Sequence, residues 1–383
     1  MGASTAFPFK QQFPVVYAET CLNNARWHPL SLGARKAITN YLDYKASGGG
    51  NAPKYSAQQQ DKVKQLYANL IGAKASEVSF VPSTLAGENL IVSSLGLPAS
   101  GGNIVTDALH FEGSLYLYGE LQRQGLDVRM VKPKNGRIEL DDVEKQIDKN
   151  TKLVALSLVS MINGFQHDLR AVCERAHAHG AYVFADIVQA AGAVPIDVRA
   201  CGVDFCAGAS YKWLMGDMGL GFLYVREDLL DRLRRPQYGY RQLSEMEYHA
   251  FPYDTPGDKV LECKQKPDAA GHFEVGTVSN TTVAALSFSL EWLQQIGVPA
   301  IKAHRQPLIQ RLQKELPALG FEPMTPLEST SPLVAFAIRD TKKLAKKLTA
   351  AKIDIAVYPH RIRVSPSLYN DQNDVDALLH SLQ

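Results

Sequence analysis

Three residues with chemically useful side chains follow two short apolar runs in the middle of the chain. The run Tyr182–Ala185 ends in Asp186, and Gln189 stands three residues later. The next apolar run ends in Gly-Ala-Ser-Tyr-Lys, whose last residue is Lys212. If both runs are parallel strands, their carboxyl ends face the same crevice of an α/β sheet. The spacing therefore predicts that the Asp186 carboxylate and the Lys212 amine share one crevice.

An amine and a carboxylate in one crevice suit pyridoxal phosphate. This cofactor bonds to a lysine amine, and it needs an acid beside its pyridine nitrogen to keep that nitrogen protonated and electron-withdrawing. The Gly-rich stretch WLMGDMGLGF after Lys212 allows tight backbone turns near a ligand. Taken alone, Asp186 and Lys212 are also compatible with a buried ion pair that carries no chemistry.

Candidate anion sites stand elsewhere in the chain. In FVPSTLAGENL, an apolar run is followed by Ser83 and Thr84 at the expected start of a helix. Hydroxyls and free backbone N–H groups at a helix N-terminus bind phosphate, although an ordinary helix cap uses the same residues. In HRIRVSPSLYN, Arg361 and Arg363 lie two residues apart on an expected strand and share a face. Arginine binds carboxylates with two parallel hydrogen bonds, so this strand is a candidate substrate site.

The elements around these residues predict an α/β protein. From residue 57 to residue 225, short apolar runs alternate with segments of helical periodicity, which predicts a mostly parallel sheet flanked by helices. Tyr238–His272 is rich in Pro, Gly and Tyr and is expected to be a long irregular connection. Further helices and strands beyond it predict a second, smaller α/β domain. We expect an N-terminal arm at 1–25, a large cofactor-binding domain at 26–270 and a small C-terminal domain at 271–383.

The amino-acid composition argues against several classes of protein. The 383 residues carry 41 Lys+Arg and 39 Asp+Glu, a balance that argues against a nucleic-acid-binding surface. No apolar stretch approaches the ~20 residues of a membrane span, so no membrane partner is expected. The five cysteines form no CxxC pair, which argues against a metal site or a disulfide framework and favours the cytoplasm.

The segment from Asp186 to Lys212 resembles the pyridoxal-phosphate signature of the class V aminotransferases. These belong to the fold-type I enzymes and include cysteine desulfurases, kynureninases and isopenicillin N epimerase-like enzymes. The resemblance extends from LNNA at Leu22–Ala25 to RVSPSLYN at Arg363–Asn370. It implies that Lys212 is the Schiff-base lysine and that Asp186 partners the pyridinium. By the same resemblance, Gln189 contacts the ring hydroxyl and Tyr211 touches the phosphate.

The resemblance assigns further cofactor contacts. It places the phosphate on Ser83, Thr84 and the backbone amide of Leu85, where the family often has another hydroxyl. Phe111 aligns best with the residue that stacks on the pyridine ring, with His110 as the second choice. Asn163 is a weaker candidate for the ring oxygen.

The resemblance also implies shared sites and a substrate carboxylate. The segment HFEVGTVSN is similar to one that reaches the phosphate of the other subunit, which makes Thr277 a cross-subunit ligand and the protein a homodimer. Arg363 corresponds to the arginine that binds the substrate carboxylate, and Arg361 is then a solvated edge charge. Asn24 and Arg26 are further substrate candidates, and cationic groups near Arg26 would suit an acidic side chain.

These residues predict a pyridoxal-phosphate enzyme acting on an amino acid or amine, with aminotransferase as the leading reaction. Epimerisation and β-eliminating C–S lyase chemistry use the same residues and remain alternatives. Persulfide-forming desulfurase chemistry is not expected, because Ile353–Ile362 lacks the cysteine that desulfurases carry there. A non-enzymatic cofactor-binding protein would not need Lys212, Asp186, Gln189 and Arg363 together. No early G-x-G-x-x-G follows the first strand, which argues against a Rossmann dehydrogenase.

Overall fold

The structure is a computed structural model that describes residues 7–48 and 52–383. Its centre is a seven-stranded sheet in the order β2-β8-β7-β6-β5-β3-β4. Strands β3 to β7 run parallel, and β8 is antiparallel to both of its neighbours. The strands are β2 (Val78–Val81), β3 (Asn103–Asp107), β4 (Asp127–Val131), β5 (Thr151–Ser157), β6 (Tyr182–Asp186), β7 (Phe205–Ala209) and β8 (Gly221–Val225).

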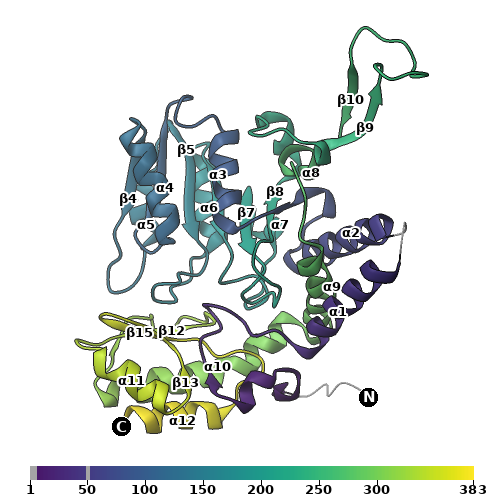
Figure 1. Ribbon diagram of the computed structural model, residues 1–383. Helices are drawn as coiled ribbons and strands as arrows, with labels where there is room; N and C mark the ends of the chain where they lie inside the picture. Colours follow the sequence, from purple (N-terminus) through teal and green to yellow (C-terminus); the bar gives the residue numbers. More distant parts are fainter. Residues whose placement is uncertain (1–6, 49–51) are drawn as a thin grey trace.

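Helices cover both faces of this sheet (Figure 1). Because successive strand residues point to opposite faces, the sheet supplies two separate apolar cores. On one side Phe184 and Phe205 join the core beneath α3 and α4, and on the other Val183 and Phe222 join the core beneath α2 and α9. The helices of this part are α1 (Leu32–Ser47), α2 (Ala52–Ile71), α3 (Thr84–Ser94), α4 (Glu112–Arg123), α5 (Leu140–Glu144), α6 (Leu169–Ala178), α7 (Val198–Cys201), α8 (Ala269–Phe273) and α9 (Asn280–Ile296).

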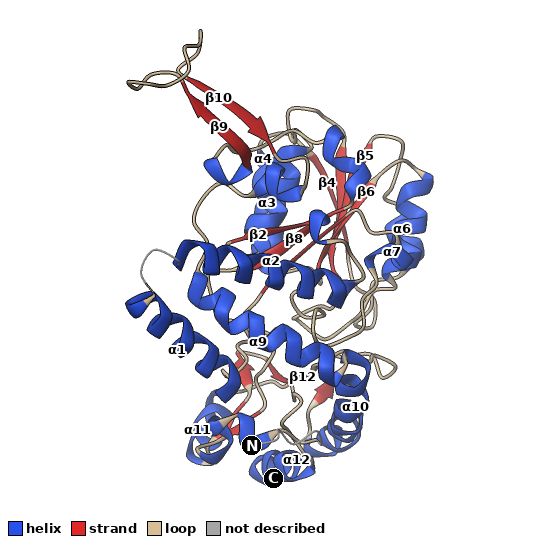
Figure 2. Cartoon of the chain, turned by 90° about the vertical axis from the view of Figure 1, so that its right-hand side faces the viewer, coloured by secondary structure: helices blue, strands red, loops and turns tan. Residues whose placement is uncertain are grey.

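A second, antiparallel sheet has the order β11-β12-β15-β14. Strands β12 and β15 face the large sheet, and helices α10 to α12 cover the side of the small sheet that faces away from it (Figures 1 and 2). A two-residue parallel pairing of β1 with β13 ties the N-terminal segment to this part. Its elements are β1 (Thr20–Cys21), β11 (Glu322–Pro323), β12 (Val334–Ala337), β13 (Ile353–Asp354), β14 (Ala356–Tyr358), β15 (Arg361–Val364), α10 (Val298–Glu315), α11 (Lys342–Ala350) and α12 (Gln372–Leu382).

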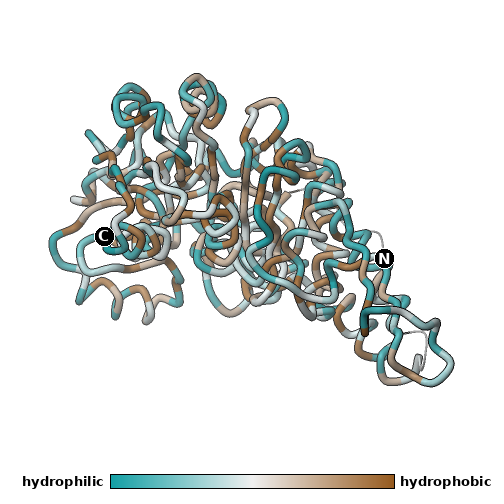
Figure 3. The backbone as a smooth tube through the Cα atoms, turned by 90° about the horizontal axis from the view of Figure 1, so that it is seen from above, coloured by the Kyte–Doolittle hydropathy of each residue, from teal (hydrophilic) through white to brown (hydrophobic). Residues whose placement is uncertain are grey.

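The predicted α/β fold is therefore confirmed, with a large, mostly parallel sheet flanked by helices. Peripheral helices carry hydrophilic and hydrophobic residues within each turn, which agrees with the helical periodicity of their sequences (Figure 3). The division at residues 25 and 270 stays a prediction. No helix among the described residues is long and apolar enough to cross a membrane.

One expectation for the connection after the large sheet is wrong. Instead of a wholly irregular Tyr238–His272, the chain forms a projecting hairpin of β9 (Leu243–Tyr248) and β10 (Leu261–Gln265), followed by α8 (Figure 1). Sequence periodicity did not reveal the hairpin, because all of its strand residues except Leu243 are exposed and no buried face imposes an alternating pattern.

Tyr67 and Phe222 stack on each other in the core beneath α2, and a substitution there measures how much this packing stabilises the fold. Phe222 lies in β8 and is fully buried, and its ring stacks on Tyr67 with ring centroids 3.8 Å apart. Phe222→Ala should lower the free energy of unfolding by about 3–5 kcal/mol, because the surrounding core cannot fully close the cavity. Urea unfolding measures this change, with Met218→Ala at an exposed position as the control. A loss equal to that of the control would contradict the packing.

Candidate active site

A cavity of about 230 Å³ opens beside the carboxyl ends of β5, β6 and β7. This is the edge at which parallel α/β sheets bind ligands. The cavity wall contains most of the cofactor contacts predicted from the sequence and several neighbours. Its lining residues are Ser83, Thr84, Leu85, Phe111, Ser157, Val159, Met161, Asp186, Val188, Gln189, Ala209, Tyr211 and Lys212.

Lys212 supplies the amine of this cavity. It lies three residues beyond the end of β7 and is buried. Burial lowers the pKa of Lys212 to about 8; the charge of Asp186 opposes this shift and that of Arg363 adds to it. No carboxylate among the described residues lies within 4 Å of the Lys212 amine. The amine is therefore neutral in a large fraction of molecules near pH 8 and can act as a nucleophile or a base.

Asp186 supplies the carboxylate at the end of β6. Its Oδ1 accepts a hydrogen bond of 2.9 Å from the Val188 N–H, and its Oδ2 accepts a longer one of 3.4 Å from the Ser157 hydroxyl. Burial raises the pKa of Asp186, while His110 and Lys212 act in the opposite direction. Within the described part of the chain, no cation forms an ion pair with it. A buried carboxylate with spare acceptor capacity fits a protonated pyridine nitrogen.

A charged hydrogen-bond network lies behind Asp186, and the sequence did not reveal it. His110 Nδ1 lies 2.8 Å from the Ser157 hydroxyl, and His110 Nε2 lies 3.1 Å from Glu88 Oε1. The hydroxyls of Ser114 and Tyr118 also donate to the fully buried Glu88 carboxylate. Burial alone would lower the pKa of His110, but the charge and hydrogen bond of Glu88, together with the charges of Asp186 and Asp107, raise that pKa. The sequence does contain one sign of this network, because Glu88 is an acidic residue followed by the apolar run Leu90–Val92 of the same helix.

The predicted phosphate contacts lie where α3 begins. The Ser83 hydroxyl accepts from the Ala86 N–H at 3.1 Å, and the Thr84 hydroxyl accepts from the Ala209 N–H at 2.9 Å. Ser83 is thus a helix cap and a cavity-lining residue at once, so the two interpretations of this segment are compatible. Leu85 also lines the cavity, and the helix N-terminus favours an anion there.

Two other cavity residues differ in how firmly they are held. Gln189 is fixed by neighbours: its Nε2 donates to the Ala25 carbonyl at 2.9 Å, and its Oε1 accepts from Trp213 Nε1 at 2.9 Å. One Nε2 hydrogen of Gln189 remains for a ligand. Phe111 presents its ring to the cavity, whereas His110 is fully buried and does not line it.

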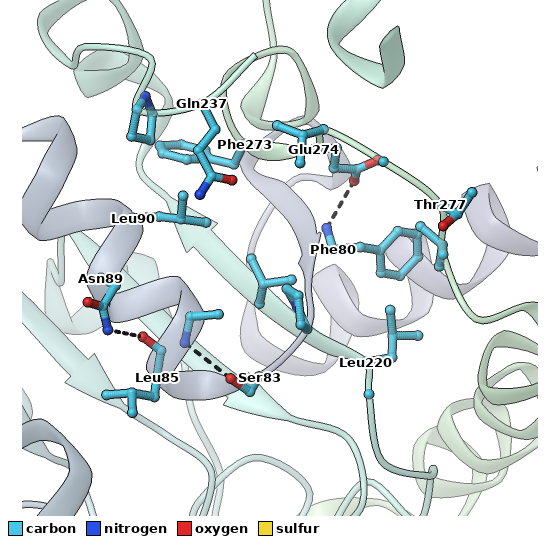
Figure 4. Close-up of a pocket in the computed structure, with 18 of the residues that line it drawn as sticks. Phe80, Ser83, Leu85, Asn89, Leu90, Leu220, Gln237, Phe273, Glu274 and Thr277 are labelled. Carbon is cyan, nitrogen blue, oxygen red and sulfur yellow. Dashed lines mark hydrogen bonds between the residues drawn. The ribbon is translucent and has the colours of Figure 1, made fainter. Parts of the chain in front are cut away.

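Besides Arg363, four predicted site residues lie outside the cavity wall. Asn163 donates to the carbonyls of Gly136 and Met324, and Asn24 bonds to Ser365 and Tyr369, so both amides are occupied by the fold. Arg26 is exposed. Thr277 lines a neighbouring groove of about 780 Å³ that shares Ser83 and Leu85 with the cavity (Figure 4).

Arg363 lies at the border between the small sheet and the cavity. It extends from β15, is buried, and its Nη1 donates to the carbonyl of the cavity residue Met161 at 3.0 Å. Its charge acts on Lys212. The structure therefore brings the predicted carboxylate-binding arginine close to the predicted amine, although the two residues come from different sheets.

The fold and this cavity define a pyridoxal-phosphate-dependent enzyme. A family model described as Aminotransferase class-V matches residues 34–378, and the chain belongs to that family. Among curated relatives, an uncharacterized aminotransferase YcbU from Bacillus subtilis (strain 168) is 27% identical over 96% of this chain and 94% of its own. A cysteine desulfurase from Klebsiella pneumoniae (strain 342) is 28% identical over 85% of this chain and 82% of its own.

Solved structures share the fold over nearly the whole chain. The apo cysteine desulfurase from Thermococcus onnurineus NA1 superimposes with a TM-score of 0.84 at 22% identity, covering 97% of this chain and 95% of that one. The cystine C-S lyase C-DES, in complex with its product cysteine persulfide, gives a TM-score of 0.84 at 21% identity over 97% and 99% of the two chains. The fold-type I assignment from the sequence is confirmed.

The lowered pKa of Lys212 predicts unusual reactivity in the cofactor-free protein. Only the neutral amine reacts, so labelling of Lys212 by a small acylating reagent should rise from pH 7 and level off above pH 9. A solvated lysine, with a pKa of ~10.4, gains reactivity up to about pH 11. Mass spectrometry of the labelled peptides measures both, with the urea-unfolded protein as control. A Lys212 profile identical to that of the unfolded chain would contradict the assignment.

Proposed function

We propose that this protein is an aminotransferase that removes the amino group of an amino acid. The observation that carries the proposal is the buried Lys212 amine. Burial and the charge of Arg363 lower its pKa, and the charge of Asp186 raises it, so that the pKa is about 8. Bound pyridoxal phosphate supplies an electron sink that makes the Cα proton of the substrate acidic. A base of matched pKa must then take that proton, and Lys212 is suited to it.

Each of the other residues has a separate task in this proposal. Arg363 binds the substrate α-carboxylate, and a guanidinium fork fixes the orientation of the substrate as well as its position. Asp186 stabilises the protonated ring nitrogen of the cofactor. The N-terminus of α3, with Ser83 and Thr84, holds the phosphate. With the cofactor bound, Lys212 Nζ would accept the proton from the substrate Cα and donate it again in the next step, so that one base would serve both proton transfers.

A β-eliminating C–S lyase is the second candidate, and one observation favours it over a desulfurase. No cysteine is among the residues that line the cavity, so no described thiol there can take up sulfur as a persulfide. Cys21 is buried beside the N-terminal strand pairing, and Cys263 lies on the exposed hairpin. Lys212 alone is sufficient to remove the Cα proton and expel a β-substituent from cysteine or cystine.

A half-reaction screen distinguishes these reactions. Holoenzyme mixed with single amino acids should pass from its visible absorption to that of the aminated cofactor, with release of one 2-oxo acid per site. Lys212→Ala should slow this conversion at least 1,000-fold, because no other base of the cavity replaces the amine. Stopped-flow absorption measures the rate, and Tyr116→Ala at an exposed position is the control.

The products decide between the candidates. Ammonia and pyruvate from cysteine or its thioethers, without aminated cofactor, would replace the aminotransferase by the lyase. Loss of Cα stereochemistry with neither product would indicate the epimerase. Persulfide on Cys21 or Cys263 during turnover would overturn the exclusion of desulfurase chemistry.

We further propose that two copies of the chain share their active sites. Thr277 lies across the groove from Ser83, and the groove joins the phosphate side of the cavity through Ser83 and Leu85 (Figure 4). A second copy seated on this groove would bring its own Thr277 toward the phosphate. Most residues that line the groove are apolar, which is compatible with the apolar core of a homodimer interface.

Complementation tests the shared site. Lys212→Ala and Thr277→Ala homodimers should both be impaired, whereas a heterodimer of the two variants contains one site with both residues intact. That heterodimer should recover about half of the wild-type activity per dimer. Tandem affinity purification isolates it, and size-exclusion chromatography with light scattering verifies its mass. A verified heterodimer without recovery, or a monomeric wild-type protein, would contradict the proposal.

A further inference from the structure

Two arginines gather around Tyr358 at the border of the cavity, and the charge of a third arginine acts on one of them. Arg361 and Arg363 extend from β15, and their guanidinium carbons lie 4.1 Å and 5.9 Å from the centre of the Tyr358 ring. Ile362 and Val364 of the same strand are fully buried in the core of the small sheet. Because side chains alternate along a strand, both arginines lie on the opposite face, where Met161 of the cavity meets Arg363.

The third arginine is Arg26, which comes from the N-terminal segment. Its neighbour Ala25 is fixed on two sides: the Ala25 N–H donates to the Ser365 hydroxyl at 3.0 Å, and the Ala25 carbonyl accepts from the cavity residue Gln189. Arg26 therefore follows a residue that joins the cavity wall to the segment after β15. Its charge acts on Arg363, and its own side chain is exposed to solvent.

This cluster has no counter-charge within the described residues. No carboxylate lies within 4 Å of Arg26, Arg361 or Arg363, whereas Arg137 and Arg311 elsewhere each pair with an acidic residue. The Nε atoms of Arg361 and Arg363 are buried and have no hydrogen-bond partner. Buried unpaired donors are rare in folded proteins and call for an explanation such as a ligand.

The like charges also disfavour one another. Burial lowers the pKa of Arg363, and the charges of Arg361 and Arg26 lower it further, while Tyr358 acts in the opposite direction. Holding three cations together costs free energy unless an anion joins them. A single α-carboxylate, placed on Arg363 as in the proposed function, leaves Arg361 and Arg26 without a partner.

We propose that the substrate is an amino acid with a second carboxylate in its side chain, bound by Arg361 and Arg26 while Arg363 binds the α-carboxylate. This inference rests on the proposed function for the role of Arg363. It changes the assignment of Arg361, which the sequence suggested to be a solvated edge charge. Arg26 follows Ala25, which bonds to the cavity residue Gln189, and its exposed side chain is free to meet the second carboxylate.

Equilibrium binding of acids that lack an amino group tests the substrate class without turnover. Isothermal titration of the holoenzyme with glutarate and with butyrate compares two carboxylates with one. The wild-type protein should bind glutarate at least tenfold more tightly than butyrate. Arg361→Gln and Arg26→Gln should each reduce that ratio by about fivefold to tenfold, because each removes one partner of the second carboxylate.

Two further variants separate charge from packing. Arg361→Lys keeps the charge and should retain most of the preference for glutarate, although it cannot form two parallel hydrogen bonds. Arg123→Gln removes an exposed arginine at the end of α4, which flanks the large sheet, and should leave the ratio unchanged. Equal binding of the two acids by the wild-type protein, or an unchanged ratio in both Gln variants, would overturn the proposal.

The half-reaction screen distinguishes a wrong substrate class from a wrong proposed function. If alanine or another monocarboxylic amino acid reacts as fast as glutamate and aspartate in a Lys212-dependent way, only the substrate class is wrong. If no amino acid reacts and neither acid binds, the proposed function is wrong as well. A preference for glutamate or aspartate that Arg361→Gln reduces would support both.

Discussion

A buried amine and a buried carboxylate occupy neighbouring strand ends without forming an ion pair, and the organisation of the site follows from this arrangement. Burial lowers the pKa of Lys212 and raises the pKa of Asp186, so in both residues it favours the neutral form. A direct ion pair would have stabilised both charges and removed the reactive amine. Separation leaves the amine available to bond a cofactor and the carboxylate available to its ring nitrogen.

Residues behind the Asp186 carboxylate oppose the effect of burial on its pKa. His110 bonds to the buried Glu88, and the charge and hydrogen bond of Glu88, with the charges of Asp186 and Asp107, raise the pKa of the imidazole against the effect of its burial. A positive group at that position opposes the effect of burial on Asp186. Ser157 connects the two through its hydroxyl. The pKa of Asp186 is therefore influenced by His110 and Glu88, which do not line the cavity.

The second constraint is the contact between the two sheets. Lys212 belongs to the large sheet, and Arg363 belongs to the small one. The N-terminal segment links them, because Ala25 bonds both to Ser365 beyond β15 and to Gln189 in the cavity wall. Asn24, a substrate candidate from the sequence, bonds to Ser365 and Tyr369 and fixes this segment. The small sheet is therefore tied to the cavity wall, through Ala25 to Gln189 and through Arg363 to Met161.

Local sequence determined the strands, most helices and the residues at the strand ends, because hydrophobic periodicity and backbone preferences act over a few residues. It placed Asp186, Lys212 and the Ser83–Leu85 segment correctly relative to their own elements, and β15 is observed over the residues expected. It left the exposed hairpin unrecognised, since a strand without a buried face has no alternating pattern.

The residues that shift the pKa values of the site could not be predicted from the sequence. The contacts of His110 with Glu88 and of Gln189 with Trp213, and the gathering of Arg26 beside Arg361 and Arg363, join distant segments. Tertiary packing alone decides which charges meet and how deeply they are buried, and the pKa values that govern the chemistry depend on both.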